Sequence, residues 1–334
     1  MTTPTADDVL SAVERVAPFA SETPLLRNDA LDAAVGAKVW IKPENLQVTG
    51  SFKIRGAANR LTQLGEAERR AGVVAYSSGN HAQGISRAAR MLDIPATIVM
   101  PSDAPGVKIE GVKRDGARIV TYDRWGESRE TIAAQICEEA GAILVPSYDD
   151  PHILAGQGTA GVELARQVQS IGAHLDHVIC CIGGGGLIGG LALAFEVLSP
   201  STRIWGAEPE HYDDWLRSLE GGTVVANRRD APASLCDSIL TPQPGDITWS
   251  VGRSRIAGGF RVSDGEVAAA MRFAFRHMKL VVEPGGSAAL AAALYRRPKA
   301  WLGQSVGLLL TGGNVDPDLY ARAISGEIPG PDLR

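Results

Sequence analysis

The stretch SFKIRGA, residues 51–57, places one lysine, Lys53, between a phenylalanine and an isoleucine. Ser51 is a residue type that caps helices, which predicts that Lys53 lies in the first helical turn. Burial and the positive end of a helix dipole both lower the pKa of an ammonium group. Because a neutral amine attacks carbonyl carbons, Lys53 is suited to hold an aldehyde cofactor as a Schiff base. A solvated lysine at a helix start is the ordinary alternative.

A second motif is SSGNHAQG, residues 77–84, which comes after the apolar run GVVAY. We expect the run to be a strand and the motif to open a helix, whose free N–H groups form an anion site suited to a carboxylate. Asn80 and His81 add side-chain donors. An ordinary capped turn would explain one of these polar residues but not the whole run.

A third motif is GGGGLIGG, residues 183–190, after the apolar run HVICCI. Backbone amides without side chains close around a phosphate, and the helix that comes next supplies its dipole. A competing interpretation uses Gly184, Gly186 and Gly189, which match G-x-G-x-x-G, with Glu208 at the end of the next strand. This is the dinucleotide fingerprint of an NAD-dependent oxidoreductase. It leaves Lys53 and SSGNHAQG unexplained.

Together the motifs resemble the fold-type II pyridoxal phosphate enzymes, specifically the serine/threonine dehydratase and serine racemase family. The resemblance runs from about Val16 to Asp316. It rests on seven blocks in family order: ENLQVTGSFKIRGA, SSGNHAQG, AGQGTAGVE, GGGGLIGG, GAEPEHYDD, KLVVEPGG and LTGGNVD. It implies an α/β fold like that of the tryptophan synthase β subunit, with two open twisted, mostly parallel sheets flanked by helices.

The resemblance also implies how the chain holds pyridoxal 5'-phosphate. Lys53 carries the cofactor and moves protons at the substrate Cα, Phe52 packs against the pyridine ring, and Asn80 bonds the ring's phenolic oxygen. Thr311 stands where the family places a hydroxyl near the pyridine nitrogen. Glu283 matches a glutamate close to the cofactor, with a helix cap as the alternative. The phosphate is held by the four consecutive glycines Gly183, Gly184, Gly185 and Gly186.

The same resemblance assigns the substrate side of the site. Ser77, Ser78, Asn80 and His81 hold the α-carboxylate, and Arg129 reaches it when a small domain closes; a solvent-facing arginine is the alternative. Racemases and hydroxyaspartate dehydratases of the family have SSGNH here, as this chain does. The hydroxyl of Ser78 then supplies a second acid/base, which racemisation requires.

A divalent cation site is implied by GAEPEHYDD, residues 206–214. In the racemase-like subgroup, positions matching Glu208 and Asp214 bind the ion together with the backbone carbonyl at Tyr212. Ligation by oxygen alone suits Mg²⁺, Mn²⁺ or Ca²⁺. A pair of solvated acids after a strand is the alternative.

Bulk composition narrows the functional classes. The chain of 334 residues has a net charge of -5 and no long basic run, so nothing favours nucleic acid or a membrane surface as a partner. Residues 178–195 lack charge, but their consecutive glycines argue against a membrane span. Four cysteines without CxxC spacing and an N-terminus without an apolar signal region fit a reducing cytoplasm. The family leads us to expect a homodimer.

Short apolar runs alternate with amphipathic helical patterns along the chain, which predicts parallel sheets covered on both faces. We expect a small, mobile substrate domain at residues 72–149 and a large cofactor-binding domain from residues 1–62 and 150–334. Strands are expected at 37–44, 72–78, 96–101, 118–123, 142–147, 177–182, 203–209, 260–264 and 305–312. The Gly/Pro-rich stretch 221–259 is expected to form loops.

These observations predict a pyridoxal phosphate-dependent lyase. It would convert a small β-hydroxy amino acid (serine, threonine or 3-hydroxyaspartate) to a 2-keto acid and ammonia. The nearest alternative is an amino-acid racemase with dehydratase side activity. An NAD-dependent oxidoreductase is the alternative from a different class. Ser238, where racemases often carry glycine, leaves the side-chain preference open.

Overall fold

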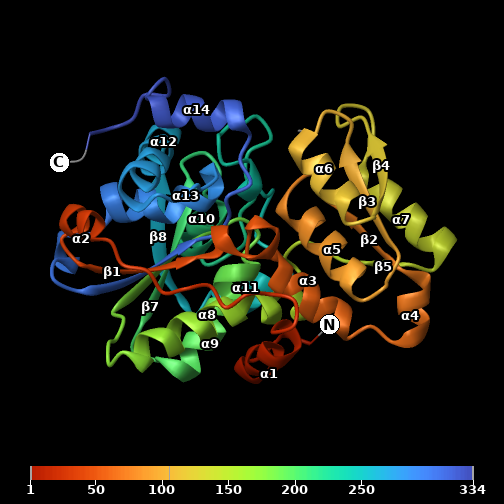
Figure 1. Cartoon of the computed structure of the whole chain (residues 1–334), viewed down its shortest axis with the longest axis horizontal. Helices are drawn as coiled ribbons and strands as arrows, with labels where there is room; N and C mark the ends of the chain where they lie inside the picture. The colour runs from red at the N-terminus through yellow and green to blue at the C-terminus, as the bar shows by residue number, and fades with distance from the viewer. Residues whose placement is uncertain (1, 105, 333–334) are drawn as a thin grey trace.

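The computed structural model describes residues 2–104 and 106–332 and confirms an α/β fold with two parallel sheets. Figure 1 shows the smaller sheet and its helices at the right and the larger sheet at the left. The larger sheet has the order β1-β9-β6-β7-β8, and the smaller has the order β4-β3-β2-β5. Every pairing between these named strands is parallel.

The larger sheet is buried on both faces, as continuous apolar strands require. Adjacent residues of one strand show this, because Cys180 packs in the core shared with α8 and α9, whereas Cys181 packs in the core shared with α12 and α13. The strands of this sheet are β1 (Lys38–Pro43), β6 (His177–Cys181), β7 (Arg203–Pro209), β8 (Ile256–Val262) and β9 (Ser305–Leu310). Those of the smaller sheet are β2 (Val73–Tyr76), β3 (Ala96–Pro101), β4 (Arg118–Tyr122) and β5 (Ile143–Leu144).

Helices connect the strands and cover the sheets (Figure 1). Within the described residues, no helix is long and apolar enough to cross a membrane. The α-helices are α1 (Ala6–Val16), α2 (Asp29–Val35), α3 (Lys53–Thr62), α4 (Glu66–Ala71), α5 (Asn80–Met91), α6 (Gly106–Arg114), α7 (Arg129–Ala140), α8 (Pro151–Ser170), α9 (Gly186–Leu198), α10 (Asp214–Gly221), α11 (Asp246–Gly252), α12 (Asp264–Phe273), α13 (Pro284–Ala291) and α14 (Pro317–Ser325).

Two expectations about local structure are wrong. The stretch 221–259 is not all loop, because it contains α11 and the first half of β8. Gly258 has φ +136°, and the pairing of β7 with β8 shifts register between Ile204 and Gly206. Glycines that suggested a loop therefore serve an irregular strand. The strand expected at 142–147 has only two residues, since the chain leaves the sheet before Pro146.

The start of α3 is held by a buried network of charges around Arg55. The Arg55 guanidinium donates to Glu44, directly after β1, at 2.7 and 2.8 Å, and to Glu163, on α8, at 2.6 and 2.7 Å. Lys42 Nζ lies 2.6 Å from Glu163 and completes a set with two cations and two anions. Such pairs are costly to break, because the remaining partner keeps a buried charge. The network therefore fixes α3 against β1 and α8.

Helices α8 and α9 approach closely through glycines. A Cβ on Gly158 would lie 2.7 Å from the Gly190 carbonyl oxygen and 2.7 Å from Val9 Cγ1. Backbone atoms cannot move aside as a flexible side chain can. The spacing between these helices, and with it the start of α9, therefore depends on this glycine.

We predict that Gly158→Ala lowers the free energy of unfolding by about 2 kcal/mol, because it overpacks this contact. Gly221→Ala is the matched control, since nothing lies within 4 Å of the Cβ it would add. The control should be neutral or slightly stabilising, because alanine favours helix. Urea unfolding of both variants measures the difference, and equal stabilities would contradict the close contact.

Candidate active site

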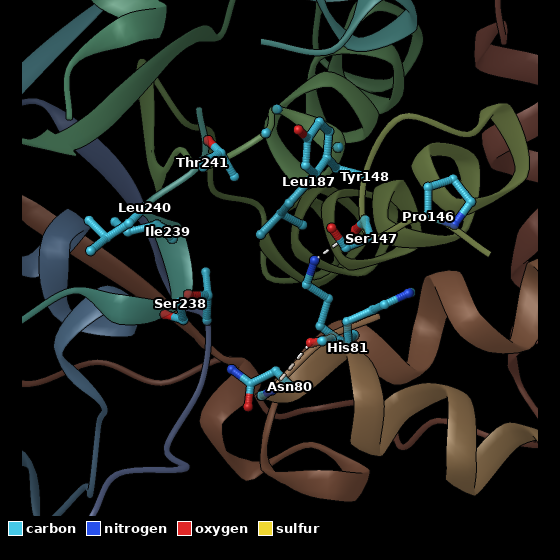
Figure 2. A pocket seen from close by; sticks show the side chains of 18 of the residues that line it. Asn80, His81, Pro146, Ser147, Tyr148, Leu187, Ser238, Ile239, Leu240 and Thr241 are labelled. Atoms are coloured by element: carbon cyan, nitrogen blue, oxygen red, sulfur yellow. Dashed lines mark hydrogen bonds between the residues drawn. The ribbon is translucent and has the colours of Figure 1, made fainter. Parts of the chain in front are cut away.

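A cavity of about 410 Å³ lies between the two sheets, at the carboxyl ends of their strands. Segments that come after β2, β5, β6 and β9 all line it, as open α/β sheets bring strand ends together. Figure 2 shows Asn80 and His81 on one side, Ser238 to Leu240 on another, and Ser147 and Tyr148 facing them. The three motifs of the sequence analysis therefore meet around one space.

Lys53 is the first residue of α3 and lines the cavity. Its Nζ donates to the Ser147 carbonyl at 2.8 Å and lies 5.2 Å from the centre of the Phe52 ring. Burial lowers the pKa of Lys53 from 10.5 to about 8, while negative charge on Cys181 and Glu283 acts in the opposite direction. At pH 7 about a tenth of this amine is then neutral, against well under a thousandth of an ordinary lysine, and the neutral share grows as the pH rises toward 8.

The expected helix cap at Ser51 is wrong. Phe52 occupies the N-cap position and makes no capping bond through its side chain. Ser51 has extended backbone, forms an isolated bridge with Gly312, and buries its hydroxyl without a hydrogen-bond partner. The bridge to the segment after β9 holds the chain extended up to Phe52, so the helix begins one residue later than a serine cap would require.

The glycine loop after β6 presents bare backbone to the cavity. A Cβ on Gly184 would overlap the ring of Tyr148, and one on Gly185 would overlap the ring of Trp215. Gly185 also has φ +94°, a conformation that favours glycine. Since the first bond within α9 is donated by Gly189, the earlier N–H groups remain available to an anion.

The start of α5 forms the opposite wall. Its first backbone bond runs from Gln83 N to the Gly79 carbonyl, so the N–H groups of Asn80, His81 and Ala82 are free of partners within the helix. Ser77 Oγ accepts from Gly79 N at 3.2 Å and shapes this turn. Ser77 and Ser78 both line the cavity. The arrangement suits a carboxylate.

The side chain of His81 does not add the donor that we expected. Its Nε2 lies 2.9 Å from the Val145 carbonyl, which can only accept, so the ring proton sits on Nε2. Burial and the neighbouring Lys53 charge lower the pKa of His81 to about 3, which excludes a second ring proton near neutral pH. Only the backbone N–H of His81 can serve a substrate anion.

Glu283 and Thr311 both line the cavity near Lys53. Glu283 stands at the N-cap of α13 but makes no capping bond through its side chain; instead its Oε1 accepts from Asn80 Nδ2 at 2.6 Å. This geometry favours the interpretation of Glu283 as a site residue over a helix cap. Thr311 Oγ1 lies 3.2 Å from Cys181 Sγ.

Arg129 begins α7 and reaches the cavity from the smaller sheet. Its guanidinium lies 5.1 Å from the centre of the Tyr76 ring, and its Nε donates to Glu130 at 2.8 Å. The side chain lies at the cavity rim and is 42% exposed to solvent. Contact between Arg129 and a substrate carboxylate therefore stays a prediction.

Glu208 and Asp214 are buried, which rules out a pair of solvated acids. Glu208 accepts from the backbone N–H of Trp215 and Leu216, at 3.2 and 2.9 Å, and Asp214 Oδ1 accepts from Asn227 at 2.6 Å. Burial raises the pKa of Glu208 and, to about 7, that of Asp214. Asp214 Oδ2 is buried without a hydrogen-bond partner.

A cation would satisfy both features, because it provides a partner for the orphaned oxygen and offsets the burial of two acids. Among the residues that the structure describes, no three His, Cys, Asp or Glu side chains form a metal-binding group. The predicted set has two carboxylates and the carbonyl of Tyr212, so it stays a prediction.

Comparisons with known proteins decide the class of cofactor. The family model described as "Pyridoxal-phosphate dependent enzyme" matches residues 16–312. The chain belongs to this family. The dinucleotide interpretation is therefore wrong, and the buried Glu208, bonded to the start of α10, is not presented to a ribose at the glycine loop.

Relatives of the chain include both lyases and racemases. The chain is 47% identical over 319 residues to an L-threo-3-hydroxyaspartate ammonia-lyase of a Pseudomonas species, covering 96% of this chain and 98% of the relative. It is 42% identical to a serine racemase of Schizosaccharomyces pombe, with 96% and 98% coverage. The solved structure of maize serine racemase superposes with a TM-score of 0.90 at 36% identity and covers 98% of both chains.

Sequence reasoning missed several parts of the wall. Ser147, Tyr148 and Cys181 all line the cavity, and the sequence analysis assigned none of them to the site. The signal available for Tyr148 was its place in PSYDDP, directly after a strand, since polar residues at strand ends gather at one edge of a sheet. No comparable signal marked Cys181, which lies inside an apolar run.

The lowered pKa of Lys53 predicts how the cofactor-free protein binds pyridoxal phosphate. Because only the neutral amine reacts, the rate should rise with pH, reach half its plateau near pH 8, and level off above. Stopped-flow absorbance at a series of pH values measures this profile, with Lys53→Ala as the control that forms no covalent bond. A rate that still rises toward pH 10.5 would show a solvated amine.

Proposed function

We propose that the chain is a pyridoxal phosphate-dependent lyase that converts a small β-hydroxy amino acid to a 2-keto acid and ammonia. The observation that carries the proposal is the buried amine of Lys53, with a pKa of about 8, between a helix start suited to a carboxylate and a glycine loop suited to a phosphate. Relatives named as 3-hydroxyaspartate ammonia-lyases and dehydratases support 3-hydroxyaspartate as the first substrate to test.

The bound cofactor supplies an electron sink that acidifies the substrate Cα–H bond. The chain supplies the other functions. The neutral amine of Lys53 takes the Cα proton, and the backbone N–H groups at the start of α5 hold the α-carboxylate. Gly183 to Gly186 hold the phosphate, with Phe52 and Asn80 at the ring. The β-hydroxyl leaves as water by taking up one proton, which balances the proton removed from Cα, and hydrolysis of the eliminated product releases the keto acid and ammonia.

Amino-acid racemisation is the second candidate function, and Ser78 supports it. Ser78 lines the same cavity as Lys53, and its hydroxyl would act as the second acid/base. Relatives of several organisms are named serine racemases. Both activities use the same first proton transfer. They differ in the second step, which is either loss of the β-hydroxyl or return of a proton to the opposite face of Cα.

A panel of serine, threonine and 3-hydroxyaspartate stereoisomers tests both functions, with keto acid and inverted enantiomer scored separately. Lys53→Ala should lower turnover by roughly 10⁴-fold, because it removes the base and the covalent anchor. Ser78→Ala should lose racemisation and keep keto acid formation. Borohydride reduction and then peptide mass measurement should find the cofactor on Lys53. Substantial turnover by a folded Lys53→Ala variant would reject the proposal.

We propose that Glu208, Asp214 and the carbonyl of Tyr212 bind a divalent cation, Mg²⁺, Mn²⁺ or Ca²⁺. The two buried acids with raised pKa values and the unpartnered Asp214 Oδ2 support this site. The ion would neutralise charge at the start of α10. Because Asn227 bonds both Asp214 and the Thr241 carbonyl, at 2.6 and 2.8 Å, the ion would also support the cavity wall.

Mg²⁺ should raise the melting temperature of the wild-type protein, and Asp214→Asn should abolish that response. Without a cation, above pH 7, Asp214→Asn should itself be the more stable protein. The reason is that a carboxylate with a raised pKa destabilises the fold once it ionises. Asp230→Asn, at an exposed pair with Arg228, is the matched control and should keep the response. Equal Mg²⁺ responses in wild type and Asp214→Asn would contradict the site.

Three further expectations belong to this proposal. Residues 72–149 would move as a body against 1–62 and 150–334 and bring Arg129 to the substrate. A homodimer would cover the exposed apolar side chains of Leu46 and Val281, whose segments are joined by a bond from Asn45 to the Val281 carbonyl. The four free cysteines fit a cytoplasmic location.

A further inference from the structure

A hydrogen-bonded chain of four groups begins at Glu283 and Asn80 in the cavity wall and runs behind the wall to the backbone of Thr49. Asn80 Nδ2 donates to Glu283 Oε1 at 2.6 Å; Asn314 Nδ2 donates to Asn80 Oδ1 at 2.8 Å and to the Thr49 carbonyl at 2.7 Å. We propose that Asn314 is a positioning residue that orients the Asn80 amide, so that its N–H bonds face Glu283 and the cofactor ring. The inference rests on the proposed function, because Asn80 is placed at the ring there.

The chemistry of the two ends fixes the direction of the chain. The Thr49 carbonyl can only accept, so Asn314 must present its Nδ2 to it. The second hydrogen of that Nδ2 points to Asn80, which must therefore offer Oδ1. This turns Asn80 Nδ2 toward Glu283, whose carboxylate is an acceptor. A backbone carbonyl at one end and a carboxylate at the other thus require the same orientation of both amides.

The backbone holds Asn314 in place from both sides. Thr49 has φ 68° and ψ 10°, a left-handed conformation that is unfavourable for a β-branched residue. Gly50 is next in the chain with φ 71°, and its carbonyl accepts from Gly313 N at 2.9 Å. The strained turn therefore aims the Thr49 carbonyl at Asn314 and ties the two segments together.

The orientation has a direct consequence for the cofactor. Asn80 is buried and lines the cavity, and its Nδ2 keeps one hydrogen beyond the bond to Glu283. If the amide turned over, Oδ1 would face the Glu283 carboxylate, and the ring oxygen would lose its donor. Asn314 lies behind Asn80 and does not line the cavity, so it acts on the cofactor only through Asn80.

The test measures the dissociation constant and the visible absorption maximum of pyridoxal phosphate bound to purified variants. Asn314→Asp has the same shape but replaces both donors with acceptors, so Asn80 should turn over to donate to it. We expect the dissociation constant to rise about tenfold and the absorption maximum to shift. Asn314→Ala, which only removes the donors, should give smaller changes in the same direction. It carries the test if Asn314→Asp does not fold.

Asn59→Asp is the matched control. Like Asn314, Asn59 donates to a backbone carbonyl, that of His152, at 2.7 Å, and it does not line the cavity. It is fully buried, whereas Asn314 is half-buried, and its Oδ1 accepts from Arg15 at 2.7 Å. It should lower the melting temperature of the cofactor-free protein and leave the spectrum and dissociation constant unchanged.

A double-mutant cycle with Asn80→Ala isolates the pathway. If Asn314 acts through Asn80, adding Asn314→Asp to Asn80→Ala should change neither the spectrum nor the dissociation constant further. Two results would overturn the inference. One is that Asn314→Asp shifts the absorption maximum equally in wild-type protein and in Asn80→Ala. The other is that Asn80→Ala shifts the maximum but Asn314→Asp does not. A wild-type protein without visible cofactor absorption would instead reject the proposed function, and the inference with it.

Discussion

The buried Arg55 guanidinium is the interaction on which the site depends, because it fixes the helix that begins with Lys53. Glu44 and Glu163 hold it from directly after β1 and from α8. Glu44 also accepts from Thr23 at 2.7 Å. Burial alone would raise the pKa of Glu44, but the charge and hydrogen bonds of Arg55, with Lys42 and Thr23, together lower it. Lys53 lies two residues before Arg55, so the ion pairs of Arg55 determine where the reactive amine enters the cavity.

The segment that comes after β5, residues 145–149, contacts the other parts of the site and positions them. The Val145 carbonyl accepts from His81, and the Ser147 carbonyl accepts from Lys53. The ring of Tyr148, the next residue, packs against Gly184. Asp149 then accepts from backbone N–H groups at the start of α11, whose Thr248 donates to the Gly184 carbonyl at 2.7 Å. One short segment, which connects the two sheets, therefore contacts both Lys53 and the glycine loop.

Three buried acids, Glu44, Glu208 and Asp214, differ in their partners and in the direction of their pKa shifts. Glu44 faces a guanidinium and has a lowered pKa. Glu208 and Asp214 accept from neutral backbone and amide donors and have raised pKa values, since such donors do not offset the loss of water. The contrast explains why we assign the first to the scaffold and propose a cation for the second pair.

The sequence by itself determined the α/β class, the parallel strands and the residues that gather at the strand ends, because apolar periodicity and glycine placement are local properties. It also carried the prediction of a pyridoxal phosphate lyase, through motifs in a fixed order. It could not determine which groups those residues touch. Ser51 was expected to cap a helix, but a bridge to Gly312 holds its backbone extended. His81 was expected to donate to the substrate, but its Nε2–H donates to the Val145 carbonyl instead. The glycines of β8 were expected to form a loop. They belong to an irregular strand instead, and that irregularity depends on pairing with β7, which the sequence does not show. Hydrogen-bond direction, burial and the pKa of Lys53 arise from segments far apart in the chain, and only the tertiary structure brings those segments together.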